Sequence, residues 1–426
     1  MRQTAAIKSS NCARVSDHTD AATTELTNDV TSILAQQFPP ALRWFLKTLC
    51  YRWREVAIII GFLWISLLYN NHKHPFITHP HAITPEAIGR EFTLHAALSP
   101  ASSHGFLPIE DATSYCAQHK WKPYAERSRP RKVYDLFMMN DELDWLEIRL
   151  HTLFHHIDYF VVLESNQTFT GLPKPLLVKE NWARFAKFHE KIIYHEVEDM
   201  PVGATRTWDY EDHQRNAMFS QVIPRLEGIK KAEMGDVLMV SDVDEIPRSA
   251  TFTLLRNCAF QKRLTLRSQF YYYGFQWLHR GEQWAHPQAT IYAGPENTIL
   301  PVDLRNGEGR NPLLAWWDKA DLWNAGWHCS TCFGSINEVL VKMASFSHTG
   351  LNQKQFRNRT RIVDRVRNGL DLWDREGEVY DRVEENQDIP GWLKDGDNKE
   401  RFSYLLNRDG PNAGFSDYDK GEPVGE

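Results

Sequence analysis

The chain lacks an excess of basic residues. Its 49 Lys and Arg residues are outnumbered by 55 Asp and Glu residues, which gives a formal net charge of −6 at pH 7. Proteins that bind nucleic acid neutralise many phosphates with a stripe of Lys and Arg, and no such stripe is available here. The composition therefore argues against a nucleic-acid partner.

Long apolar runs are also scarce, and a single candidate lies near the N-terminus. The run VAIIIGFLWISLLYNNH begins at Val56 and carries no charge before Lys73. Its strictly apolar part is shorter than the ~20 residues of a typical membrane helix, so a buried core helix is the alternative. Basic residues precede the run closely, whereas only Lys73 lies close after it: Arg43, Lys47, Arg52 and Arg54. This asymmetry predicts a membrane span with a cytosolic N-terminus.

The predicted topology is that of a single-pass type II membrane protein. Residues 1–55 are expected to form a cytosolic tail and residues 56–72 a transmembrane signal anchor. No pattern of small residues typical of signal-peptide cleavage follows the run closely. A short span suits the thinner membranes of the early secretory pathway, so we expect the Golgi membrane, with the remainder of the chain in the lumen. The triplets at Asn166 and Asn358 are N-glycosylation sequons and agree with a lumenal body.

Cysteine is scarce as well, with six in 426 residues. Four of them follow the apolar run and could pair in an oxidising lumen: Cys116, Cys258, Cys329 and Cys332. The last two have the CxxC spacing that also occurs in zinc and redox sites. A zinc site would need a second pair of ligands, and a redox site would need a thioredoxin-like helix start. A structural disulfide or two free thiols is therefore the favoured interpretation.

The remainder of the chain divides into a stem and a folded body. Residues 73–131 are rich in Pro, His, Ser and Ala, show little periodicity, and are expected to form a stem or linker. From residue 132 apolar strands alternate with helical patterns: a strand at 133–139, a helix from Leu143, a strand from Tyr159, a helix around HQRNAM and a strand at 237–240. This order predicts an α/β domain, residues 132–426, with a mostly parallel sheet and helices on both faces.

Polar side chains follow each of these predicted strands. Asn140 and Glu142 follow the first strand, Glu164 ends the second, and Asp242 and Asp244 end the third. Because ligands of parallel sheets bind beyond the carboxyl ends of the strands, these side chains are expected to share one rim.

Asp242 and Asp244 point in the same direction, because alternate residues of a strand share a face. Two close carboxylates repel each other unless a cation lies between them, and Mg²⁺ or Mn²⁺ prefers such oxygen ligands. A metal with open positions can hold a diphosphate and neutralise the charge that develops as it leaves. The alternative is an acidic turn that caps the next helix.

The run from Lys132 to about Leu406 contains six blocks in a fixed order: YDLFMMNDELDWLEIRL, DYFVVLESNQTFTGLPKPL, the HQRNAM helix, DVLMVSDVDEIPR, GWHCSTCFGS and FSHTGLN. With these blocks in this order, the run resembles glycosyltransferase family 17. It implies a GT-A fold and a metal-dependent inverting transfer of a sugar, GlcNAc from UDP-GlcNAc, to a mannose of a glycoprotein N-glycan in β-1,4 linkage. Mn²⁺ or Mg²⁺ is the implied cofactor.

The resemblance also implies roles for individual residues. Asp242 and Asp244 would bind the metal with His348, and Asp244 would be catalytic. The implied donor-binding residues are Asn140, Glu142, Glu164, Arg215, Asn216 and Asp242. Trp327 and His328 would line the acceptor groove, and Glu338 would accept the proton of the acceptor hydroxyl.

Each of these roles has a structural alternative. Arg215 could instead pair with Glu211 one turn earlier, and Asn140 or Glu164 could cap a helix. His348 could be a packed or surface residue and Glu338 a solvent-facing acid, while Trp327 and His328 could both belong to the core.

Three alternative functions fit parts of the pattern. A phosphatase of the haloacid dehalogenase type also carries DxD after an apolar strand, but at its first strand, whereas here two strands precede the motif. A UDP-sugar transferase with a different glycan acceptor and a membrane-tethered lectin are further alternatives. Binding of UDP with Mn²⁺ separates a transferase from a lectin.

Overall fold

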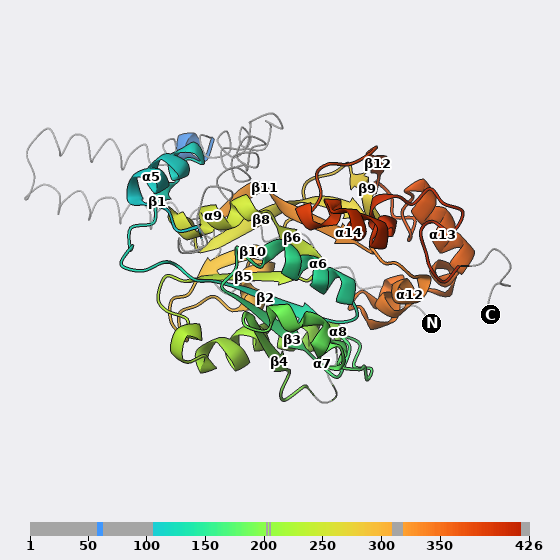
Figure 1. Ribbon diagram of the computed structural model, residues 1–426, viewed down its shortest axis with the longest axis horizontal. Coiled ribbons are helices and arrows are strands. Elements are labelled where there is room, and N and C mark those ends of the chain that lie inside the picture. Colours follow the sequence, from blue (N-terminus) through green and yellow to red (C-terminus); the bar gives the residue numbers. More distant parts are fainter. Residues whose placement is uncertain (1–57, 63–104, 202, 204–205, 309–317, 419–426) are drawn as a thin grey trace, which may run out of the picture. The chain divides into compact units, whose positions relative to one another are not determined.

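A computed structural model describes residues 58–62, 105–201, 203, 206–308 and 318–418 of the chain (Figure 1). The predicted cytosolic tail, most of the predicted membrane anchor and residues 73–104 of the predicted stem lie outside these residues. Residues 58–62 are helical. Over the described part of the chain, no helix combines the length and the apolar character that a membrane crossing requires.

The folded body contains two sheets. The strands are β1 (Lys122–Pro123), β2 (Val133–Met139), β3 (Tyr159–Glu164), β4 (Ile192–Glu196), β5 (Val237–Asp242), β6 (Glu245–Pro247), β7 (Cys258–Ala259), β8 (Arg263–Tyr272), β9 (Gly274–His279), β10 (Gln288–Ile291), β11 (Lys319–Ser330) and β12 (Tyr380–Arg382). β1 pairs with β7 alone, and the others form one large sheet.

The helices connect and cover these strands. The α-helices are α5 (Ile109–Gln118), α6 (Leu143–Leu153), α7 (Leu177–Glu180), α8 (Thr207–Ala217), α9 (Ser249–Asn257), α10 (Pro301–Asn306), α12 (Ile336–Ser345), α13 (Arg359–Asn368), α14 (Gly396–Arg401) and α15 (Ser403–Leu406). Short 3₁₀ turns occur at η2 (Trp182–Phe188), η4 (Ile223–Arg225), η5 (Gly228–Lys230), η6 (Thr349–Leu351), η7 (Lys354–Arg357) and η8 (Gly391–Lys394), and η3 (Met218–Val222) is a π-helical turn.

The large sheet is mixed. Its order is β12-β9-β8-β10-β5-β2-β3-β4, with β11 paired to β8 and β6. β4, β3, β2 and β5 are parallel neighbours, as expected, but β10 runs antiparallel between β5 and β8. The prediction of a mostly parallel sheet is therefore correct for these four strands and for the parallel pair of β8 and β11, whereas the pairings of β6, β9, β10 and β12 are antiparallel. A single residue, Tyr273, joins β8 to β9, and such a short connection favours antiparallel pairing.

Apolar side chains cover both faces of the parallel half. Along β2, Val133 and Phe137 belong to one core cluster, whereas Tyr134 and Leu136 belong to the other. This alternation follows from the two-residue period of a strand. α6 and α9 pack on the first face, and α8 with η3 packs on the second. The prediction of an α/β domain with helices on both faces is confirmed.

A third apolar cluster joins β8 and β9 to the C-terminal segments α12 and α13, which lie together in Figure 1. The fully buried Arg408 stabilises this region, because its guanidinium donates to the carbonyl oxygens of Tyr273 (2.6 Å), Phe333 (2.7 Å) and Ala413 (3.0 Å). Phe415 is buried as well. The folded body therefore continues beyond α15.

Residues 105–131, which the sequence assigns to the stem, pack against the body. α5 is joined to the end of α9 by a disulfide between Cys116 and Cys258, and Trp121 is buried. Arg131 is also buried and donates to the carbonyl oxygens of Leu255 and Cys258. These contacts come from partners more than a hundred residues away in the chain, so local composition does not reveal them. A second disulfide joins Cys329 to Cys332, which agrees with a structural interpretation of the CxxC spacing.

Candidate active site

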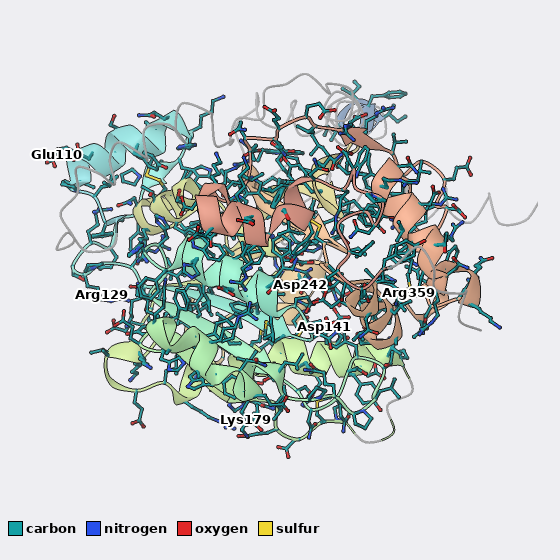
Figure 2. The ribbon with its side chains drawn as sticks, turned by 45° about the vertical axis from the view of Figure 1, so that its right-hand side comes forward. Glu110, Arg129, Asp141, Lys179, Asp242 and Arg359 are labelled. Atoms are coloured by element: carbon teal, nitrogen blue, oxygen red, sulfur yellow. A yellow bond between two sulfur atoms is a disulfide. The ribbon has the colours of Figure 1, made fainter. Side chains whose placement is uncertain are left out.

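The carboxyl ends of the parallel strands meet at one rim, as the sequence predicts. Met138 of β2 pairs with Asp242 of β5, and Met139 pairs with Glu164 of β3. Asp141 and Asp242, which follow or end neighbouring strands, lie near each other in the middle of Figure 2. The turn after β5 is therefore placed beside the end of β2.

A buried arginine holds this turn from behind. Arg149 of α6 is fully buried, and its Nε and Nη2 atoms donate to both carboxylate oxygens of Asp135, at 2.7 and 2.6 Å. Its Nη1 atom donates to the carbonyl oxygens of Asp242 (3.1 Å), Val243 (3.2 Å) and Glu245 (2.7 Å). The guanidinium binds three carbonyl oxygens of the turn at once, so the turn keeps one conformation.

The turn opens into a pocket with about 790 Å³ of empty space, part of it open to solvent. Carboxylates, cations and aromatic rings share its wall. The lining residues are Met138, Asn140, Glu142, Phe169, Glu211, Arg215, Asp242, Val243, Asp244, Trp284, His328, Ser330, Lys342, Ser345 and Phe346. A pocket with convergent charged groups at the carboxyl ends of parallel strands is a candidate active site.

Asp242 lies between two arginines. Its Oδ1 atom accepts from Arg215 Nη1 at 3.1 Å, and its Oδ2 atom accepts from Arg305 Nη2 at 2.6 Å. Desolvation acts to raise the pKa of Asp242, but the charges of Arg305 and Arg215 outweigh it and lower the pKa below the usual aspartate value. Its side chain is 38% exposed, so the ionised carboxylate remains accessible from the pocket.

Glu245 fixes Arg305 in place. The Glu245 carboxylate is fully buried and accepts from Arg305 at 2.8 and 3.0 Å, from Trp284 Nε1 at 2.7 Å and from the Asp242 amide at 2.9 Å. Burial opposes its ionisation, yet the charge of Arg305 and its hydrogen bonds lower the pKa of Glu245 well below the usual value. Glu245 is therefore an ionised anchor behind the pocket.

Asp244 faces a different cation. Lys342 of α12 places its Nζ atom 3.5 Å from Asp244 Oδ2 and 3.5 Å from Glu142 Oε1. Burial raises the pKa of Asp244 above its usual value, although Lys342 and His328 act in the opposite direction. Burial would lower the pKa of Lys342, but Asp244 and Glu142 raise it, so Lys342 stays charged.

His328 forms part of an aromatic wall. Its ring stacks on Trp284 (centroids 4.7 Å apart) and on Phe270 (5.1 Å). The buried Nδ1 atom has no hydrogen-bond partner and lies 3.6 Å from Asp244 Oδ1. β11 carries His328 close to β6 because Gly326 has no side chain: a Cβ there would lie 2.6 Å from the Ile246 carbonyl oxygen.

The structure brings together just over half of the residues that the sequence suggests. Those that line the pocket are Asn140, Glu142, Arg215, Asp242, Asp244 and His328. Arg215 pairs with Glu211 (2.8 Å), as the structural alternative predicts, and also with Asp242, and it lines the pocket. The other five predicted residues occupy different positions.

Two of these five serve as anchors. Glu164 is buried and accepts from the amides of Val178 and Lys179 at the start of α7, as well as from the Tyr194 hydroxyl. It therefore caps a helix. Asn216 accepts from the Val302 amide at 3.1 Å and so holds α10, the helix that carries Arg305.

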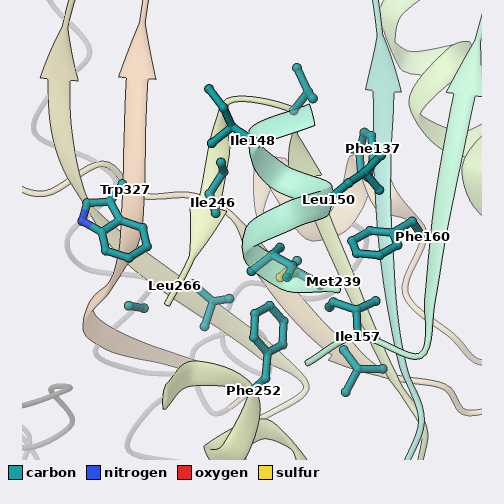
Figure 3. Packing of buried hydrophobic residues seen from close by; sticks show 14 of the residues in the cluster. Phe137, Ile148, Leu150, Ile157, Phe160, Met239, Ile246, Phe252, Leu266 and Trp327 are labelled. Carbon is teal, nitrogen blue, oxygen red and sulfur yellow. The ribbon is translucent and has the colours of Figure 1, made fainter. Parts of the chain in front are cut away.

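The three others lie outside the pocket lining as well. Trp327 is buried in the main core beside Ile246 and Leu266, as Figure 3 shows. Glu338 Oε2 accepts from the Ser335 amide (2.9 Å) and hydroxyl (2.8 Å), a capping box at the start of α12. His348 is exposed and packs edge-on against Trp208, with centroids 5.0 Å apart.

Sequence reasoning missed Arg305, Lys342 and Trp284. Arg305 and Lys342 lie on α10 and α12, far along the chain from the DVD motif, and reach it only through the fold. No local spacing marks either residue. In contrast, the capping role of Glu338 has a signal in the sequence, because Ser335-Ile-Asn-Glu338 is an S-x-x-E pattern.

The comparison with known families decides the class of this site. The sequence model of Glycosyltransferase family 17 matches residues 103–407. The chain belongs to glycosyltransferase family 17. The family membership and the enzyme class predicted from the sequence blocks are thereby confirmed.

Characterised relatives of this family 17 chain share a name. The human β-1,4-mannosyl-glycoprotein 4-β-N-acetylglucosaminyltransferase is 28% identical over 225 residues, which cover 49% of this chain and 42% of the human protein. The rat protein of the same name is 29% identical over 225 residues, covering 49% and 41%. The chain thus matches less than half of the length of these relatives.

A solved structure is distantly similar to the family 17 chain. It is a mannosyltransferase from Pyrobaculum calidifontis in complex with GDP-Man and Mn²⁺. The TM-score is 0.29 and the identity 9%, over 61% of this chain and 73% of that chain. A likeness this distant carries no argument.

Two carboxylates of the family 17 pocket are ligands of the type that a divalent cation prefers. Within the described ranges, no group of three or more His, Cys, Asp and Glu side chains is placed to hold a metal. Yet Asp242 and Asp244 face one pocket, and Mg²⁺ is commonly held by one or two carboxylates together with the phosphates of a substrate. The unpartnered Nδ1 of His328 beside Asp244 is a further possible donor.

Proposed function

We propose that this chain is a GT-A-type, metal-dependent inverting transferase that moves GlcNAc from UDP-GlcNAc to a mannose of a glycoprotein N-glycan in β-1,4 linkage. The observation that carries the proposal is the DVD turn of a family 17 chain, which lines a pocket and is paired with Arg215, Arg305 and Lys342. The names of the human and rat relatives support the donor, acceptor and linkage.

The charges around the turn support a divalent cation. Five carboxylates surround three cations: Glu142, Glu211, Asp242, Asp244 and Glu245 against Arg215, Arg305 and Lys342. Burial, and then the charge of Glu142, raises the pKa of the neighbouring Asp141 well above the usual value. A divalent cation such as Mn²⁺ or Mg²⁺ would offset the excess of carboxylates over cations around the turn.

Asp242 and Asp244 would hold the ion. Once bound, the ion would supply positive charge to the diphosphate of the donor as it leaves. Arg215, which lines the pocket, would offer a planar guanidinium to the diphosphate oxygens, whereas Arg305 stays anchored to Glu245. Trp284 and His328 offer flat ring surfaces on which a sugar or uracil ring can stack.

An inverting transfer also needs a base that faces the acceptor. Because Glu338 caps α12 outside the pocket lining, we propose Glu211 in its place. Glu211 lines the pocket, its side chain is 13% exposed, and its Oε2 atom accepts from Ser347 at 2.6 Å. It would take the proton from the attacking hydroxyl as the new glycosidic bond forms and the diphosphate leaves.

The substitution Glu211→Gln tests this assignment. It keeps the shape and hydrogen bonding of the side chain but removes its basicity, so kcat should fall by roughly 10²-fold, within the usual contribution of a positioned base. Initial rates over a range of acceptor concentrations measure the effect. Glu338→Gln is the matched control and should retain activity. If Glu211→Gln is fully active, or Glu338→Gln loses as much, the assignment to Glu211 is incorrect.

The proposed activity is tested by product analysis. The body from residue 105 is incubated with a panel of UDP-sugars, Mn²⁺ and N-glycan acceptors, and the linkage of the product is determined. We expect a β-1,4-linked GlcNAc on mannose from UDP-GlcNAc alone. Transfer of another sugar, or transfer to another residue of the glycan, would replace the donor or the acceptor in the proposal.

We also propose that the protein is a single-pass type II protein of the Golgi membrane, on the basis of the charge asymmetry around residues 56–72. When the whole chain is synthesised with microsomes, Asn166 and Asn358 should be glycosylated and the body protected from added protease. An unglycosylated, digested body would reverse the orientation.

A further inference from the structure

The segment after α12 places aromatic rings outside the pocket mouth. Ser345 and Ser347 are both buried, whereas Phe346 is half-buried and His348 is exposed. This alternation follows from the extended backbone, with Phe346 at φ −86° and ψ 147°. Phe346 lines the pocket, and His348 lies next to it with ring centroids 4.9 Å apart.

Helix α8 continues this row of rings. Trp208 lies three residues before Glu211 and seven before Arg215, so all three share one face of the helix. Glu211 and Arg215 line the pocket. Trp208 projects from the same face of the helix, one turn before Glu211 and two turns before Arg215, and therefore lies further from the pocket. Its side chain contacts His348 at a ring angle of 88°, and the residue is 41% exposed.

Buried polar contacts fix the row in place. Ser345 Oγ accepts from Asn140 Nδ2 at 2.8 Å, and Ser347 Oγ donates to Glu211 Oε2 at 2.6 Å. Thr207 Oγ1 donates to the Ser347 carbonyl oxygen at 3.1 Å, which ties α8 to the segment after α12, its neighbour in Figure 1. The rings are thus presented on rigid supports, which lowers the entropic cost of binding.

We propose that Phe346, His348 and Trp208, here called the aromatic shelf, form a subsite for saccharide units of the acceptor beyond the sugar that reacts. This inference rests on the proposed function, because the shelf continues outward from the pocket and from the proposed base Glu211. Aromatic rings bind the apolar C–H faces of sugars. The hydroxyls of the sugar then form hydrogen bonds with water or with nearby carboxylates.

The charge beside the shelf specifies the kind of saccharide. In the first two turns of α8, Asp209 pairs with Arg206 at 2.6 Å and Glu211 pairs with Arg215 at 2.8 Å, and Asp212 adds a third carboxylate to these two ion pairs. An anionic sugar would meet like charge there, while carboxylates accept hydrogen bonds from neutral hydroxyls. The shelf therefore suits a neutral branch of the glycan.

The test compares Trp208→Leu with Trp208→Phe. Binding of a free, neutral branched N-glycan is measured by calorimetry without donor, and KM is measured for the same glycan and for methyl mannoside. Trp208→Leu should weaken binding of the branched glycan and raise its KM by roughly tenfold, which corresponds to about 1.4 kcal/mol. Trp208→Phe, which keeps a flat ring, should retain most of the affinity. The KM for UDP-sugar and for methyl mannoside should stay unchanged.

Ile229→Ala is the control, because Ile229 is 83% exposed and lies near the opposite ends of the strands, where its carbonyl oxygen accepts from Tyr159. Unchanged glycan affinity in Trp208→Leu would overturn the shelf, and so would an equal loss with methyl mannoside. If the parent protein binds the branched glycan through Trp208 but does not transfer GlcNAc, the subsite stands and the proposed function fails. If the parent protein does not bind the glycan, the subsite is overturned.

Discussion

Replacement of Asp242 or Asp244 by asparagine is expected to lower kcat/KM for sugar transfer by roughly 10³-fold or more. Each substitution removes one of the two carboxylates proposed to hold the cation. A bound metal stabilises the transition state by several kcal/mol, and each loss of about 1.36 kcal/mol lowers the rate tenfold. Asparagine keeps the size of both side chains. Asp242 is partly exposed at the end of β5, and Lys342, the cation beside the buried Asp244, keeps a second carboxylate in Glu142, so the fold should persist.

Initial rates with UDP-GlcNAc, together with circular dichroism of each variant, measure this effect. Chelation with EDTA should act on the parent protein in the same way, and added Mn²⁺ should restore the rate. The calorimetric affinity for UDP in the presence of Mn²⁺ should fall in both variants. Activity of both variants within tenfold of the parent would refute the metal assignment.

The largest effect on stability is expected from Asp135→Asn. Asp135 and Arg149 are both fully buried, and two hydrogen bonds join them. Loss of the carboxylate charge leaves the guanidinium buried without a counter-charge, which typically costs about 3–5 kcal/mol in the free energy of unfolding. Urea denaturation of the body measures this change, and a loss below about 1 kcal/mol would contradict it.

A surface ion pair provides the matched control for this substitution. Asp381 and Arg280 are joined at 2.6 Å, but their side chains are 46% and 65% exposed. Water screens such a pair and hydrates the cation that remains. Asp381→Asn should therefore leave the denaturation midpoint unchanged, and a midpoint shift as large as that of Asp135→Asn would show that burial is not the cause.

Local patterns in the sequence predicted the parallel half of the fold well. The first strand, Val133–Met139, coincides with β2, and the helix expected from Leu143 coincides with α6. Both elements carry their signal in adjacent residues, as an apolar run and as helical spacing. Asp242 and Asp244 were found for the same reason, because they directly follow an apolar strand.

Features that depend on distant segments could not be predicted in this way. Arg305 and Lys342 reach Asp242 and Asp244 across more than sixty residues of chain, and nothing in their local sequence indicates this contact. His348 and Trp327 were assigned from their neighbourhood in the sequence, but the strand and helix geometry directs them elsewhere. The antiparallel direction of β10 could not be predicted either. The direction in which two strands pair depends on how the chain connects them and not on their composition.

The C-terminal end of the family match has a consequence for work with shortened forms of this protein. The match ends at residue 407, one residue before Arg408. A chain cut there would lose the guanidinium that binds the carbonyl oxygens of Tyr273 and Phe333, and would expose the apolar surface that Phe415 covers. The segment that the family model matches is therefore shorter than the folded body. Any catalytic fragment has to extend through Phe415.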